Sequence, residues 1–538
     1  MRINQLYIED FKNLKKFCID LDEDQMNTVF LGENATGKSN LIEAIVLIFK
    51  ALDLSNESTR KYPEPHFNYW LKYHCHEQEI IIDYTGRGYE IKIEGRFKPP
   101  SLKEFFSRVG KKQYLPRYVF TYYSGVSNRL DEIFWDHQRN FYKKIIKKDF
   151  DSHELDDLRR LFYVKQIHSF FVLMAFFALQ RIEKKSKDFL LEVLGIEDLE
   201  SVLFVLKEAK WENKDGGDPR FWGAEGLVKD FLSVLWEFAY VPIYHKATVY
   251  PDFRSKGVKE NHLYLFLKDK KALKDFASKY FNQNEQKPSN TFLFKALESS
   301  YISEMLKEVR VRVKKRKDGE VTFKELSEGE QQLLTVIGLL IFTREDESLV
   351  LLDEPDTHLN PLWKYDYLHY LKTLVKSKDA LESEADPEDR TTQILINTHD
   401  PIVIGSMDKS QVRMFGKQRP SKDSNEKGGT EDKFEQLKAQ ALSEAIEPDE
   451  SPRGLGFAGI LTSEMFGFKT ILDRETNQLL DERNQLLYKE SIGKLTEKDK
   501  KRLQVLFEEL SQKGFNHIFK DPLYSEYIIE KLKSLEGN

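Results

Sequence analysis

Cysteine is scarce in this chain, and a membrane-length apolar segment is missing. The only two cysteines, Cys18 and Cys75, lie far apart in the sequence, which argues against a disulfide framework and for a reducing compartment. The longest apolar run, at residues 170–179, falls well short of the roughly 20 residues that a spanning helix needs. The first residues, MRINQLYIEDFKNLKK, are charged and strand-like, unlike a secretory signal. We therefore expect a cytoplasmic protein with no membrane contact.

An excess of positive charge is missing too. The formal net charge is −6, from 83 Lys and Arg against 89 Asp and Glu. The chain as a whole is therefore not a general polyanion binder, and any contact with nucleic acid must come from a local patch. Its 40% hydrophobic and 32% charged residues are typical of a globular protein. At about 100–200 residues per domain, this length allows roughly three or four domains.

Local patterns divide the chain into five segments. Short strands, a Gly-rich loop and a helix are predicted in residues 1–137, and a hairpin and two buried parallel strands in residues 305–415. The aromatic-rich stretches of residues 138–304 predict a mostly helical insertion. Residues 416–436 are polar and predict a flexible linker, and residues 437–538 predict a mostly helical C-terminal module. The predicted fold class is α/β, with a mixed sheet and helices.

One stretch has the pattern of a phosphate-binding loop. GENATGKS, at residues 32–39, fits G-x-x-x-x-G-K-[ST] and lies between a predicted strand and a predicted helix. The two glycines let the backbone wrap around phosphates, and the lysine reaches the β- and γ-phosphates of ATP. The serine hydroxyl is expected to bind Mg²⁺. The candidate nucleotide-binding residues here are Gly32, Asn34, Ala35, Thr36, Gly37, Lys38, Ser39 and Asn40.

Polar residues also follow two later apolar strands. Asp353 ends the run LVLLD, where its carboxylate can join Ser39 in holding Mg²⁺, and Glu354 can polarise an attacking water. His399 follows the next strand and could hydrogen-bond the γ-phosphate or that water. An acid or a histidine at a strand end is common by itself. After a phosphate-binding loop, the pattern favours ATP hydrolysis, with Glu354 and His399 as catalytic candidates.

A second candidate anion site lies almost three hundred residues after the first. LSEGEQQLL, at residues 326–334, opens a predicted helix with Ser327, Gly329 and Glu330. The N–H groups of a helix start point outward, and the helix dipole favours negative charge there. The sequence thus predicts two phosphate sites in one chain.

The order of these motifs resembles that of ABC-type ATPases, and the chain is similar to their soluble branch, which includes Rad50, SMC, RecF and OLD-family proteins. The resemblance implies that the signature loop of one copy closes on the ATP of another, with Ser327 and Gly329 at the γ-phosphate. It therefore implies a homodimer or higher oligomer with composite ATP sites. THLNP, at residues 357–361, then matches the D-loop at the dimer seam.

Two positions depart from the family pattern. Glu328 stands where transporters have glycine, as is common in the soluble branch. No unambiguous Q-loop glutamine is present, and YYSGVSNR, at residues 122–129, occupies its place. The second contact to Mg²⁺ is therefore left open.

Four stretches narrow the resemblance to the ATPase subunit of Septu-type antiphage systems, which is also found attached to retrons. They are LPRYVFTYYSG, DEPDTHLNPLW, RGLGFAGILTSEMFGF and KDPLYSEYI. This resemblance implies a separate HNH-type nuclease subunit and, in the retron form, a reverse transcriptase with its RNA and DNA. The PARIS ATPase, which sequesters a Toprim nuclease, is a near alternative. The C-terminal module lacks the acidic pattern of a Toprim domain, so any cutting is expected of a partner.

Other interpretations remain open. A DNA repair or recombination ATPase of RecF or Rad50 type would act on DNA directly, although the long heptad repeats of Rad50 are missing. A transporter subunit is disfavoured by the long insertion before the signature. A basic cluster in a predicted hairpin either faces solvent or contacts a phosphate backbone. Its members are Arg310, Arg312, Lys314, Lys315, Arg316 and Lys317. A predicted helical hairpin, with Thr496 as an N-cap, packs on its own core or docks a partner.

Overall fold

The computed structural model divides the chain into two compact units. Unit 1 is Met1–Phe457 and unit 2 is Ala458–Asn538. The described residues are 1–56, 65–125, 127–148, 159–179, 187–209, 217–250, 252–254, 256–316, 319–322, 326–342, 347–374, 392–416 and 433–515. Residues 417–432 of the predicted linker and Lys317 of the predicted basic cluster lie outside them. None of the helices in the described part of the chain combines the length and apolar character that crossing a membrane requires.

A six-stranded parallel sheet forms the centre of unit 1, with the strand order β16-β3-β15-β14-β7-β8. Its strands are β3 (Asn27–Leu31), β7 (Tyr118–Tyr123), β8 (Leu161–Val164), β14 (Ser348–Asp353), β15 (Gln393–Asn397) and β16 (Val412–Met414). Strands β3, β14 and β15 are buried at every residue, as parallel strands covered on both faces are. The carboxyl ends of these three neighbours meet at one edge of the sheet.

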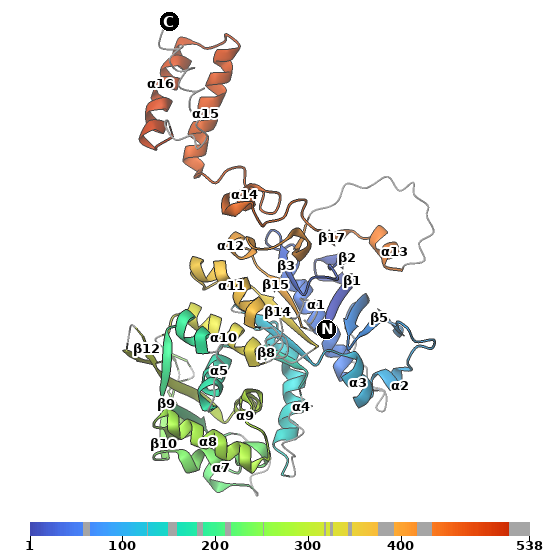
Figure 1. Ribbon diagram of the computed structural model, residues 1–538, viewed down its shortest axis with the longest axis vertical. Coiled ribbons are helices and arrows are strands. Elements are labelled where there is room, and N and C mark those ends of the chain that lie inside the picture. The colour runs from blue at the N-terminus through green and yellow to red at the C-terminus, as the bar shows by residue number, and fades with distance from the viewer. Residues whose placement is uncertain are drawn as a thin grey trace. The chain divides into compact units, whose positions relative to one another are not determined.

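A second, mostly antiparallel sheet lies nearby, in the order β17-β2-β1-β4-β5-β6 (Figure 1). Its strands are β1 (Arg2–Phe11), β2 (Leu14–Asp20), β4 (Tyr69–Cys75), β5 (Gln78–Thr85), β6 (Gly88–Ile93) and β17 (Ser443–Ala445). Helix α1 (Lys38–Leu54) joins both sheets in one apolar core, which includes Leu6, Phe30 and Ile45. The predicted N-terminal strands and the helix after the loop are confirmed.

A third sheet accompanies the helices of residues 138–304, which the prediction of a mostly helical insertion did not include. It is antiparallel, in the order β10-β11-β9-β12-β13. Its strands are β9 (Ile196–Lys207), β10 (Ile243–Val249), β11 (Val258–Leu267), β12 (Leu306–Lys315) and β13 (Gly319–Thr322). The apolar residues of β11 bury Leu263, Leu265 and Leu267 in alternation, which is the period of a strand. A domain boundary at residue 304 would separate β12 from its neighbour β9.

Helices cover one face of this third sheet. Contacts join α5 and α9 to β12, α8 to β9 and β11, and α7 to β11 (Figure 1). These helices are α5 (Ile167–Ala178), α7 (Gly226–Phe238), α8 (Lys270–Gln283) and α9 (Asn290–Ile302). The other helices of unit 1 include α2 (Leu102–Phe105), α3 (Arg108–Tyr114), α4 (Trp135–Ile145), α10 (Glu328–Phe342), α11 (Pro361–Leu374), α12 (Pro401–Ile404) and α13 (Lys433–Ala439). Short turns of other helix types lie at Asp131–Phe134, Phe189–Val193, Pro219–Phe221 and Lys409–Gln411.

The predicted start of the C-terminal module, at residue 437, also differs from the structure. Helix α13 and strand β17 belong to unit 1, because β17 pairs with β2 and α13 packs on the same sheet. The Phe434 ring is fully buried and stacks on Trp70, with 5.3 Å between ring centroids. Phe434, which the sequence analysis placed in the flexible linker of residues 416–436, is thus in a helix, and it and β17 complete the N-terminal sheet, an association that local sequence patterns do not reveal.

Unit 2 contains the predicted helical hairpin. Helices α15 (Arg474–Ser491) and α16 (Glu497–Gln512) pack through Leu486, Leu503 and Leu506, and α14 (Gly456–Thr462) precedes them. Thr496 caps α16 as predicted, because its hydroxyl accepts from the N–H of Asp499 at 3.2 Å.

The packing of Phe434 predicts a stability effect. Replacing Phe434 by Ala should lower the free energy of unfolding of unit 1 by about 3 kcal/mol, since a buried ring is lost and a cavity remains. Urea unfolding followed by tryptophan fluorescence would measure this. Phe468→Ala, at a ring that is 55% exposed, is the control and should change little. An equal, small effect of both variants would contradict the assignment of α13 to unit 1.

Candidate ATP site

The predicted phosphate-binding loop connects β3 to α1. Gly32 and Gly37 have φ angles of 147° and 108°, a region that favours glycine. A Cβ atom on Gly32 would lie 2.9 Å from the carbonyl oxygen of Phe415, and one on Gly37 would lie 2.6 Å from Leu14 Cδ2. Both positions therefore favour glycine for backbone conformation, and Gly32 also for space, because its neighbour is a backbone oxygen. The loop is a cradle of the kind that phosphates occupy at a helix N-terminus.

Lys38 lies inside this cradle. Its Nζ donates to the carbonyl oxygens of Gly32 at 2.7 Å and Glu33 at 2.8 Å. Burial lowers the pKa of Lys38 to about 8, although the nearby Glu354 and Asp353 carboxylates oppose this shift. A bound phosphate would favour the protonated lysine, so the residue fits the predicted contact with the phosphates of ATP.

Ser39 and Asp353 meet as the Mg²⁺ prediction requires. The Ser39 hydroxyl donates to Asp353 Oδ1 at 3.0 Å, and Asn397 Nδ2 donates to Ser39 Oγ at 3.2 Å and to Asp353 Oδ1. Burial raises the pKa of the fully buried Asp353 carboxyl. A divalent cation would favour the ionised form. A hydroxyl beside a carboxylate is an oxygen donor set that suits Mg²⁺.

Glu354 and His399 form a pair at the same edge of the sheet. His399 Nε2 lies 3.2 Å from Glu354 Oε1, and both side chains are partly exposed. The hydrogen bond from His399 lowers the pKa of Glu354, as do the charges of Lys38 and Arg129. Glu354 is therefore ionised near neutral pH and can accept a proton. Its φ angle of 53° is unusual for a residue other than glycine, and strained backbone of this kind concentrates at functional sites.

The predicted signature residues form the start of α10. The Ser327 N–H and hydroxyl donate to Glu330 Oε2 at 2.8 and 3.1 Å, and the Glu330 N–H donates to Ser327 Oγ at 3.3 Å. This is a capping box. A Cβ atom on Gly329 would lie 2.5 Å from the carbonyl oxygen of His358, so glycine permits the close approach of the predicted D-loop.

The signature loop and the phosphate-binding loop remain apart within one chain. No hydrogen bond or ion pair between described residues joins residues 326–330 to residues 32–39. Ser327 is exposed. The structure thus brings together Lys38, Ser39, Asp353, Glu354 and His399, and it leaves Ser327, Gly329 and Glu330 at a second location.

The segment expected in place of the Q-loop approaches Asp353 from the other side. The Ser124 N–H donates to the Asp353 carbonyl oxygen at 3.2 Å, and Arg129 Nη2 lies 3.5 Å from Asp353 Oδ2. The Ser124 and Thr357 hydroxyl oxygens are 3.1 Å apart, which links this segment to the D-loop. From this segment, the positively charged side chain of Arg129 therefore reaches Asp353, the predicted metal ligand, where a glutamine is usual.

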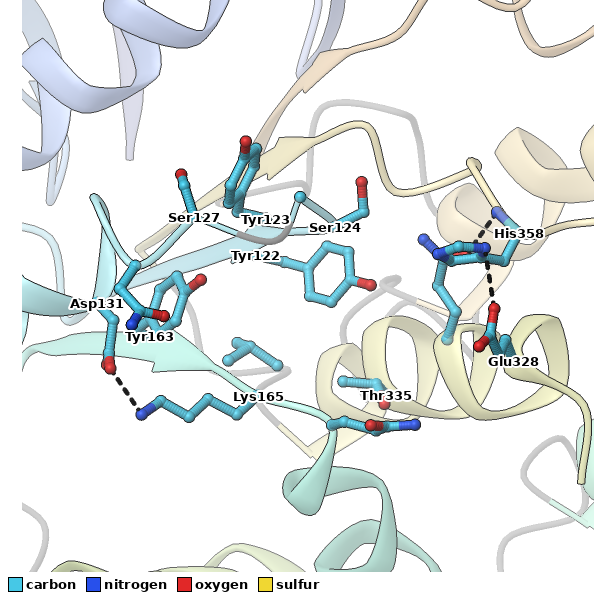
Figure 2. Close-up of a pocket in the computed structure, with 15 residues that line it drawn as sticks. Tyr122, Tyr123, Ser124, Ser127, Asp131, Tyr163, Lys165, Glu328, Thr335 and His358 are labelled. Atoms are coloured by element: carbon cyan, nitrogen blue, oxygen red, sulfur yellow. Dashed lines mark hydrogen bonds and ion pairs between the residues drawn. The ribbon is translucent and has the colours of Figure 1, made fainter. Parts of the chain in front are cut away.

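A cavity of about 370 Å³ lies between this segment, the end of β8 and the start of α10. Figure 2 shows ion pairs at two sides of it, Lys165 with Asp131 and Glu328 with His358. The second pair joins α10 to the D-loop, with 3.4 Å between His358 Nδ1 and Glu328 Oε2. Glu328, which departs from the transporter pattern, therefore has a partner in the D-loop.

Three residues of the site were missed in the sequence. Asn13 Nδ2 donates to the Ala35 carbonyl oxygen at 2.5 Å, and its Oδ1 accepts from Asn40 at 2.7 Å. Arg129 and Asn397 both contact Asp353. Asn397 could have been found, because it ends a buried strand beside the strand of Asp353, and polar residues at such ends share one edge. Nothing local marks Asn13, whereas Arg129 lies in the stretch expected in place of the Q-loop but was not singled out there.

Two protein-family models of ATPase domains match parts of this chain. A family model described as an AAA ATPase domain matches residues 1–204. A model described as an AAA domain, putative AbiEii toxin, Type IV TA system, matches residues 241–405.

Similar proteins come from DNA repair. A segment is 27% identical over 124 residues to the DNA replication and repair protein RecF of Geotalea uraniireducens, covering 22% of this chain and 33% of that protein. Another is 42% identical over 59 residues to RecF of Lactobacillus acidophilus, covering 11% and 15%. The chain thus matches a third or less of the length of these relatives.

Among solved structures, an SMC head bound to the C-winged helix domain of ScpA aligns over 77% of this chain and 94% of that chain. The TM-score is 0.29 and the sequence identity is 12%. The two matches confirm the predicted enzyme class, an ATPase: parts of the chain are similar to AAA-type ATPase domains, and shorter segments are similar to RecF proteins.

Proposed function

We propose that this chain binds ATP with Mg²⁺ and hydrolyses it at a site shared between two copies. One observation carries the hydrolysis: the ends of β3, β14 and β15 bring Lys38, Ser39, Asp353, Glu354 and His399 together. Lys38 and the loop N–H groups bind the β- and γ-phosphates, and Ser39 and Asp353 hold the metal ion. Mg²⁺ would supply positive charge between the phosphates.

Glu354 and His399 act on the attacking water. The ionised Glu354 carboxylate accepts a hydrogen bond from this water and orients it toward the γ-phosphate. His399, 3.2 Å from that carboxylate, holds it in place and can donate to a phosphate oxygen. Asn397, bonded to both Ser39 and Asp353, keeps the two metal ligands together.

The sharing between copies is supported by the position of the signature loop. Ser327 is exposed at a helix start, and among the described residues no hydrogen bond joins it to the phosphate-binding loop of its own chain, so its hydroxyl could turn from Glu330 to the ATP of a second copy. Residues beside the D-loop also expose apolar surface, since Leu362 is 78% and Tyr365 is 64% exposed. Such surface next to a proposed seam suits a dimer or higher oligomer.

We further propose that the ATP state controls a partner nuclease in bacterial antiphage defence, as the Septu-like stretches imply. Unit 2 suits a docking role, because it is separate and exposes apolar side chains, among them Phe468, Ile471 and Tyr488. The toxin named in one family description is consistent with defence. The partner would be an HNH-type subunit and, in a retron, also the reverse transcriptase with its RNA and DNA.

A RecF-like DNA repair ATPase is the second candidate, and the two RecF similarities favour it. Nucleic acid would meet the predicted basic cluster, of which Arg310, Arg312 and Lys314 are exposed on one face of β12. Co-purification from the host distinguishes the candidates: an HNH-type protein supports the first, and DNA alone supports the second.

Replacing Glu354 by Gln should leave ATP bound but uncleaved. The amide keeps the shape of the side chain and loses the proton acceptor, so we expect the hydrolysis rate to fall at least about a hundredfold. ATP-dependent dimers should persist in light scattering. Glu285→Gln is a matched control, because Glu285 is exposed and also has a positive φ angle, of 52°. Parental hydrolysis by Glu354→Gln would place the base elsewhere.

Two inactive variants, each with a substitution in a different one of the two anion sites, should regain ATP hydrolysis when they are mixed. Lys38→Ala should prevent nucleotide binding, and Ser327→Arg should bind ATP but fail to close on a second copy. Each should be inactive alone. A mixture can form one intact composite site, so part of the activity should return. Ser327→Arg hydrolysing ATP at the parental rate as a monomer in light scattering would refute the composite site.

Removing residues 458–538 should release the partner nuclease. The catalytic residues all lie in unit 1, so ATP hydrolysis should remain close to that of the full chain. Co-purification with a co-expressed HNH-type subunit would measure docking. Retention of the subunit by the shortened chain would move the docking surface to unit 1.

A further inference from the structure

Lys315 of the third sheet reaches the signature loop. Lys315 Nζ donates to Glu330 Oε1 at 2.7 Å, and both side chains are mostly buried, at 15% and 13% exposure. Lys315 is the last residue of β12, and Glu330 is in the first turn of α10. This ion pair connects a sheet remote from the phosphate-binding loop to the residues proposed to meet a second copy.

The alternation of strand β12 separates Lys315 from the rest of the basic cluster. Val309, Val311 and Val313 are buried, whereas Arg310, Arg312 and Lys314 are exposed. Lys315 has the parity of the valines and therefore points to the inner face of the strand. It belongs to the surroundings of the signature loop, and a nucleic acid on the outer face would not contact it.

The Glu330 carboxylate needs a counter-charge where it lies. Its Oε2 accepts from the Ser327 N–H at 2.8 Å and from the Ser327 hydroxyl at 3.1 Å, so it fixes the serine. The same carboxylate would stand close to a γ-phosphate bound at Ser327, and like charges at such a distance repel each other strongly in a partly buried site. A cation at the other carboxylate oxygen offsets this repulsion and keeps the capping geometry.

We propose that Lys315 is a positioning residue for the signature loop. Its ammonium orients Glu330 so that the carboxylate accepts the hydrogen bond from the Ser327 N–H. Its positive charge also offsets the repulsion between Glu330 and the triphosphate of a facing copy. On closure the Ser327 hydroxyl turns from Glu330 to the γ-phosphate, while the Glu330–Lys315 pair and the bond from the Ser327 N–H remain. The inference rests on the proposed composite site and adds a residue to it.

The test compares Lys315→Gln with three other variants in the absence of nucleic acid. Lys315→Arg keeps the charge, Lys246→Gln makes the same change at an exposed lysine of β10, and Ser327→Arg is the reference for a broken signature. Lys315→Gln should bind ATP as the parent does. It should need about tenfold more protein for half-maximal ATP-dependent dimerisation, because a partly buried carboxylate loses its partner. Lys315→Arg should retain most of the dimerisation, and Lys246→Gln all of it.

Mixing identifies the side of the composite site on which Lys315 acts. Lys315→Gln should regain hydrolysis when mixed with Lys38→Ala, whose signature loop is intact, and should not regain it with Ser327→Arg. A general loss of folding would weaken ATP binding and give neither pattern.

The outcomes separate the two proposals. Parental activity of Ser327→Arg would remove the composite site itself. If Ser327→Arg is defective but Lys315→Gln dimerises as well as Lys246→Gln does, the composite site stands and the role of Lys315 is overturned. Loss of ATP binding in Lys315→Gln would also overturn it, since the residue would then support the fold and not the signature loop.

Discussion

The parallel register of β3, β15 and β14 is the constraint on which the candidate site depends. Asp353 of β14 pairs with Asn397 of the neighbouring strand β15. Asn397 in turn pairs with Phe30 of β3, the strand that leads into the phosphate-binding loop. Backbone hydrogen bonds therefore set the distances among three chain segments that are remote in sequence. Side chains add the last connections, through Ser39 and Asn397 to Asp353. A shift of one residue in this register would turn Asp353 away from the loop.

The features that the sequence revealed are those encoded over short distances. The two glycines and Lys38 of the loop carry their own conformational and chemical reasons, and the acid after β14 follows from the rule that strand ends collect polar groups. The cap of α16 by Thr496 is local in the same way. These residues could be named without knowing which strands are neighbours. Their roles in catalysis are proposals that the geometry supports.

The features that the sequence concealed depend on tertiary neighbours. The strands of the third sheet alternate with helices, and their aromatic and apolar residues resemble amphipathic helices until the pairing partners are known. Arg129 contacts Asp353 from the stretch expected in place of the Q-loop, where no contacting residue could be named, and Phe434 completes a core whose other buried members lie near the N-terminus. Lys315 was grouped with its neighbours by charge, although the pleat of the strand places it on the opposite face.

The central sheet also has a consequence for how the protein is made. Its neighbours β3 and β15 are joined in space, yet Leu31 and Gln393 are roughly 360 residues apart in the chain. A ribosome adding about 5–20 residues per second would need roughly 20–70 s to cover that interval. During this time β3 has neither of its strand partners, β15 and β16, although α1 can already pack on the N-terminal sheet, as Phe49 does on Tyr73. Contacts of such long range form slowly, so the apolar residues of β3 stay without their neighbouring strands until residues 393–414 have been made.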